Sequence, residues 1–173
     1  MKLINCKDIE KKLPLSNFDD FVDENYENNN IIYISFFDRW LTRDDIEIKK
    51  TPTYYLDGHA DKSFYEKYYE FENKLIQVFI YLFKRNKLYG FLPINSRKRT
   101  PIFTFINEDD LSSTIKVFLR LEHGLCLYFL EEDILFNLNE DLTIQVFNKN
   151  LNEEVIDLII SLNLHVLRKR DAL

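Results

Sequence analysis

Residues 125–147, LCLYFLEEDILFNLNEDLTIQVF, decide the fold that we expect for this chain. Three apolar runs alternate here with two polar turns: Leu125–Leu130, Glu131-Glu132-Asp133, Ile134–Leu138, Asn139-Glu140-Asp141 and Leu142–Phe147. Short apolar runs that are separated by tight polar turns are typical of antiparallel strands joined by hairpins. The stretch therefore predicts an antiparallel meander.

Further apolar segments outside this stretch extend the predicted sheet. β-Branched and aromatic residues favour strands, and such residues fill four more runs: Ile31–Phe37, Leu88–Leu92, Ile102–Ile106 and Ile115–Leu121. Residues 44–50 can form a short strand, and the tail Leu164–Arg170 either adds a last strand or frays. The predicted sheet therefore includes segments from most of the chain.

Two helices are predicted to cover this sheet. Between Ala60 and Arg85, apolar side chains recur every three or four residues, which gives a helix one buried stripe: Phe64, Tyr68, Phe71, Leu75, Phe79 and Leu82. Asn152 is a good cap for a second, C-terminal helix. A shorter helix is predicted from a Ser16 cap to Asn25, and Asn107 can cap a helical turn. The fold class is α+β, with the meander packed against the long central helix and the C-terminal helix.

Length and composition limit the possible functions. The 173 residues predict one domain, 1–173, and the three glycines are too far apart for a phosphate-binding loop. We therefore expect no cofactor. The longest apolar run, Val78–Phe83, is far too short to cross a membrane, we find no signal peptide, and two cysteines make no disulfide framework. These features predict a cytoplasmic protein that does not bind membranes.

Charge is unevenly distributed along the chain. The net charge is −6, which disfavours nucleic acid as a partner and favours basic proteins. Acids are concentrated in the two predicted turns, as Glu131, Glu132, Asp133, Glu140 and Asp141, whereas the segment from Lys84 to Arg99 is basic. Within that segment, Arg97-Lys98-Arg99 can bind phosphate, although a basic hairpin loop is more often simply solvated.

Three groups of residues have the composition of a catalytic or metal site. Asp38 with the Glu-x-Lys element of Glu47 and Lys49 matches the metal-binding pattern of restriction-type nucleases, or else belongs to an exposed edge strand. His59 between Asp57 and Asp61 is either a site or an exposed helix-capping loop. His123 and Cys126 are zinc-ligand types, but they lack a second pair. The metal-dependent nuclease is the alternative function that we keep.

Tyrosines exceed what one buried helix face can hold. The surplus lies in the 54–69 region, and the residues that we expect to contact a partner are Tyr54, Tyr55, Tyr65 and Tyr69. Tyrosine is enriched at the energetically dominant positions of protein interfaces because it supplies a large contact area with few rotatable bonds and a polar tip. We therefore predict a protein-binding surface and no catalytic residues.

In general character the chain resembles the immunity proteins of bacterial toxin systems, in particular the contact-dependent growth inhibition type. The resemblance rests on the small acidic chain, a composition typical of AT-rich bacterial genomes, the missing catalytic signature, and the acidic segment Glu131-Glu132-Asp133…Glu140-Asp141. Immunity proteins act as antitoxins: they bind a cognate toxin domain, often a basic nuclease, and block it. The resemblance therefore implies an acidic surface with aromatic anchors that binds a toxin domain.

Overall fold

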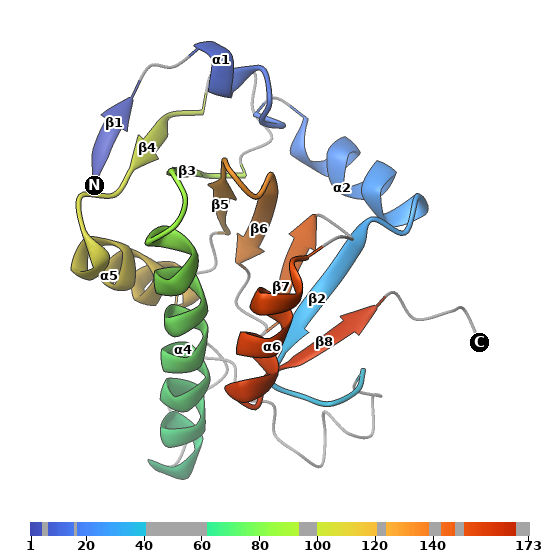
Figure 1. Ribbon diagram of the computed structural model, residues 1–173, viewed down its shortest axis with the longest axis vertical. Helices are drawn as coiled ribbons and strands as arrows, with labels where there is room; N and C mark the ends of the chain where they lie inside the picture. Colours follow the sequence, from blue (N-terminus) through green and yellow to red (C-terminus); the bar gives the residue numbers. More distant parts are fainter. Residues whose placement is uncertain are drawn as a thin grey trace.

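The computed structural model describes residues 1–4, 7–15, 17–40, 62–93, 100–120, 124–138, 143–147 and 151–168. Eight strands in these ranges form one antiparallel sheet in the order β1-β4-β3-β5-β6-β7-β2-β8 (Figure 1). Their bounds are β1 Lys2–Ile4, β2 Ile31–Ser35, β3 Leu88–Phe91, β4 Ile102–Thr104, β5 Leu125–Phe129, β6 Ile134–Leu138, β7 Thr143–Phe147 and β8 His165–Arg168. The predicted meander is confirmed as β5-β6-β7.

Five helices accompany the sheet in the described ranges: α1 Lys7–Glu10, α2 Phe18–Glu27, α4 Lys62–Phe83, α5 Glu108–Leu119 and α6 Glu153–Ser161. The predicted long helix and the C-terminal helix are confirmed as α4 and α6. Asn152 caps α6, since its side chain accepts a hydrogen bond from the backbone N–H of Glu154 at 3.0 Å. α2 begins after Asn17, and the predicted cap Ser16 lies outside the described residues.

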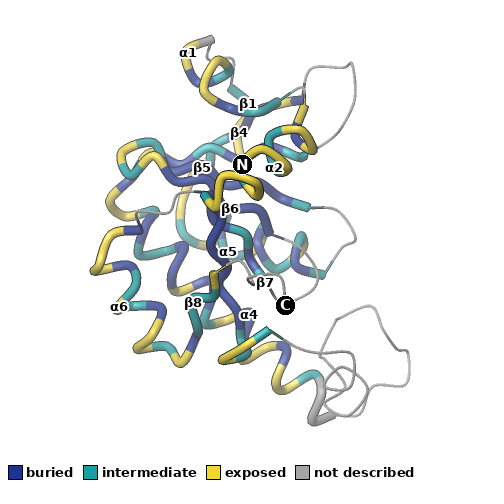
Figure 2. Tube along the Cα trace, turned by 90° about the vertical axis from the view of Figure 1, so that its right-hand side faces the viewer, coloured by how far each residue is buried: buried dark blue, intermediate teal, exposed yellow. Residues whose placement is uncertain are grey.

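The sheet separates two apolar cores, which we call the first core and the second core. The first core lies between the sheet and α4, α5 and α6, and the predicted α4 stripe is buried there at Tyr68, Phe71, Leu75, Phe79 and Leu82. The second core lies between the opposite face and α1 and α2 (Figures 1 and 2). Apolar packing on both faces explains why most strand residues are buried, with no alternation of apolar and polar positions.

The prediction of a strand at Ile115–Leu121 is wrong, because residues 115–119 belong to α5. Leu111, Ile115 and Leu119 recur every four residues and are all buried in the first core, so the period is helical. The side chain of Asn107 caps the helix by accepting a hydrogen bond from the N–H of Asp110 at 2.9 Å. β1 and α1 were not predicted at all, since neither spans more than four residues.

Candidate protein-binding surfaces

The acidic turn Glu131-Glu132-Asp133 connects β5 to β6, and two of its carboxylates hold the turn together. Asp133 has a positive φ of 52° and accepts a hydrogen bond from the Tyr128 hydroxyl at 2.5 Å. Glu131 accepts the backbone N–H of Lys87 at 2.6 Å, and the N–H of Glu132 donates to the side chain of Asn86 at 3.0 Å. The predicted contact residues Glu131 and Asp133 are exposed, but they also stabilise the fold.

Tyr128 shows how strongly this turn is tied to the sheet. Its ring is buried in the second core with 4% exposure. Burial, followed by the hydrogen bond to Asp133 and the negative charge of that carboxylate, raises the pKa of the phenol above its ordinary value. The hydroxyl therefore remains a proton donor to Asp133 at any physiological pH.

The predicted contact residues Tyr65 and Tyr69 lie together on α4. Their rings stack with a centroid distance of 6.2 Å, and Tyr69 is 38% exposed. The guanidinium of Arg120, which follows α5, lies 5.1 Å from the centre of the Tyr69 ring. We call Tyr65, Tyr69 and Arg120 the tyrosine–arginine cluster. Tyr and Arg are the residue types that most often dominate protein interfaces.

A buried carboxylate fixes the position of Arg120 in this cluster. Glu72 of α4 is 1% exposed, and Arg120 donates two hydrogen bonds to it, Nε to Oε2 at 2.8 Å and Nη2 to Oε1 at 2.6 Å. Because two parallel hydrogen bonds join the guanidinium to the carboxylate, the Arg120 side chain has little rotational freedom. Sequence inspection did not predict Arg120, because it lies 48 residues from Glu72 along the chain.

The tyrosine–arginine cluster and the acidic turn lie near opposite ends of α4. Tyr65 is in the first turn of the helix, whereas Lys87, which binds Glu131, follows its last residue, Phe83. The rise along the helix from Tyr65 to Phe83 is about 27 Å, at 1.5 Å per residue. A standard interface covers about 800 Å² per partner, so a patch of that size is only about 30 Å across. The described contact residues therefore form two separate groups, which a single interface of standard size could reach only at its opposite edges.

The most acidic exposed surface among the described elements is one that sequence inspection did not single out. Helix α2 carries five acids and no base, and all five side chains are exposed: Asp19, Asp20, Asp23, Glu24 and Glu27. Tyr26, also exposed at 46%, lies among them. The opposite side of α2 packs against the second core through Phe18, Phe21 and Val22. We call the five acids together with Tyr26 the acidic face of α2.

Helix stability does not explain the charges on this face. Acids near the helix N-terminus, such as Asp19 and Asp20, interact favourably with the helix dipole, but Glu24 and Glu27 lie near the C-terminus, where cations are preferred. Three pairs of like charge four residues apart repel one another, namely Asp19 and Asp23, Asp20 and Glu24, and Asp23 and Glu27. Asp20 accepts a hydrogen bond from the Asn17 side chain at 2.7 Å, but the repulsion between these pairs reduces the stability of the helix.

The remaining predicted residues are placed as follows. Asp38 is exposed in the segment after β2. The contact residues Tyr54, Tyr55, Glu140 and Asp141 lie outside the described residues, as do Glu47, Lys49, His59, His123 and the basic loop Arg97-Lys98-Arg99. The structure therefore leaves the proposed nuclease site of Asp38, Glu47 and Lys49 untested.

Cys126 lies in the second core, where its thiol is fully buried. Its sulfur is 3.6 Å from Oδ1 of Asn137 on the neighbouring strand, and Asn137 Nδ2 donates to Gln145 Oε1 at 2.8 Å. Burial raises the pKa of the Cys126 thiol well above its ordinary value. A buried neutral thiol is a poor nucleophile and a poor metal ligand. Among the described residues, no three His, Cys, Asp or Glu side chains are close enough together to bind a metal ion.

Comparisons with protein-family models, with curated proteins and with solved structures found no match. None of the helices in the described ranges has both the length and the apolar character that a membrane span requires.

Proposed function

We propose that this chain is an immunity-type protein, which binds a cognate toxin domain and neutralises it by covering its active site. The observation that carries the proposal is the acidic face of α2, where one helix presents five exposed acids and an exposed tyrosine. Complementary charge accelerates association and selects partners of opposite sign. The proposed partner is therefore a basic protein surface.

A nuclease domain is the toxin class that best fits such a surface. The active site of a nuclease binds phosphates and is therefore positively charged. An acidic helix placed over that site resembles the phosphate backbone in charge and excludes the substrate. The proposal thus explains inhibition without a catalytic group on the inhibitor.

The packing of α2 supports its role as a rigid binding element. Phe18 lies 6.3 Å from the ring of Phe91 and 6.1 Å from the ring of Phe147, both edge to face, and Phe21 lies 5.0 Å from Phe147. These contacts anchor the helix on the sheet, so little entropy is lost when it binds a partner. In Figure 1, α2 lies at the same end of the strands as the β5–β6 turn. The exposed acids Glu131 and Asp133 of that turn therefore add to the negative electrostatic potential around α2.

The first test is co-expression with toxin domains that are encoded next to the gene for this chain. Growth is scored with and without the chain, and the mixture is then run on gel filtration. The proposal predicts growth rescue and a complex that elutes as one peak. A toxin domain that remains lethal and elutes separately would count against it.

Matched variants show whether the acidic face of α2 is responsible. Asp23→Asn with Glu24→Gln should slow association at low salt by about tenfold or more, because steered association rates depend strongly on charge. Glu153→Gln with Asp157→Asn removes two exposed acids from α6 and is the control. If both double variants slow association equally, net charge matters and α2 is not the binding surface.

A further inference from the structure

We draw no further inference here: the strongest candidate, the tyrosine–arginine cluster on α4 and at the end of α5, combines two stacked rings with a guanidinium that is already bound by Glu72, and nothing in the structure shows what covers it.

Discussion

Arg120 and Glu72 form a two-pronged ion pair that joins α5 to the middle of α4. Two hydrogen bonds, of 2.8 and 2.6 Å, reach a carboxylate that is 1% exposed, and the guanidinium also lies over Tyr69. One side chain thus neutralises a buried charge and positions an exposed aromatic ring. A residue with both roles affects stability and surface structure together.

Arg120→Ala should therefore destabilise the protein substantially. Removal of one partner leaves the Glu72 carboxylate buried without compensation, and we expect a loss of about 2–3 kcal/mol in the free energy of unfolding, because Arg120 is itself partly exposed. Arg120→Lys should reduce the free energy of unfolding by less, since lysine keeps the positive charge although it cannot form both hydrogen bonds to Glu72. Urea unfolding measures both values. If Arg120→Ala unfolds at the wild-type midpoint, the ion pair does not stabilise the fold.

Gly90→Ala should destabilise the β3–β4 pair. A β-carbon at Gly90 would come within 2.7 Å of Cζ of Phe103, whose ring is buried in the first core. The ring must move, which we expect to cost about 2 kcal/mol. Thermal unfolding tests this. The control is the same substitution in a Phe103→Leu background, which lacks the ring. If the clash with the ring is the cause, Gly90→Ala should reduce stability clearly less in that background than in the wild type.

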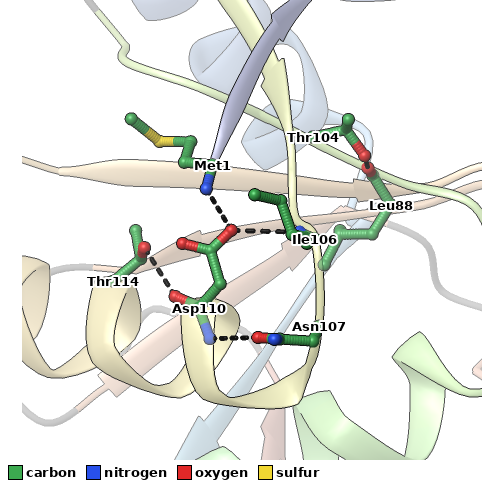
Figure 3. A network of polar contacts seen from close by, with 7 residues as sticks. All are labelled: Met1, Leu88, Thr104, Ile106, Asn107, Asp110 and Thr114. Atoms are coloured by element: carbon green, nitrogen blue, oxygen red, sulfur yellow. Dashed lines mark hydrogen bonds and ion pairs between the residues drawn. The ribbon is translucent and has the colours of Figure 1, made fainter.

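Asp110 should make stability depend on pH in the acid range. Hydrogen bonds from the Met1 ammonium and the Ile106 N–H (Figure 3) lower the pKa of this carboxyl in the folded state. Its contribution is therefore present above the unfolded pKa of about 3.9 and is lost as pH falls through the lower, folded value. Asp110→Asn should lower the free energy of unfolding by about 1 kcal/mol at neutral pH, and by progressively less as the pH falls below about 3.9. A difference that stays constant with pH would contradict this assignment.

Tyr128 should contribute to stability until the pH becomes alkaline. Burial and Asp133 raise the pKa of the phenol in the folded state, so its contribution is complete below about pH 10 and is lost as pH rises above that value. Tyr128→Phe should lower the free energy of unfolding by about 1 kcal/mol at pH 7, because the hydrogen bond to Asp133 is lost. Above pH 10, urea midpoints of the wild type should fall more steeply than those of Tyr128→Phe. Parallel curves would show that Tyr128 ionises normally.

Several local elements were predictable because short-range signals specify them. The turns around Glu131 and the alternation of short apolar runs with polar turns predict β5, β6 and β7, and Asn152 predicts the start of α6. The strand predicted at Ile115–Leu121 failed because Ile115, Val117 and Leu119 also fit a period of two. The helical period becomes clear only when Leu111 is included.

The candidate surfaces were predictable only in part. The acids and the stacked Tyr65 and Tyr69 were found from residue type alone. Arg120 was not, because a contact over 48 residues leaves no local pattern. The acidic face of α2 was visible as five acids in ten residues, but its exposure depends on how Phe18 packs against Phe91 and Phe147.

By itself, the sequence determined the α+β class, the meander β5-β6-β7 and the buried stripe of α4, since periodicity and turn residues act over a few positions. Only the tertiary structure decided that β2 lies between β7 and β8, that β1 pairs with β4, and that Arg120 meets Glu72. Strand pairing between distant segments is chosen by how both faces of the sheet bury their apolar side chains. That choice is a property of the whole packed core and of no single segment.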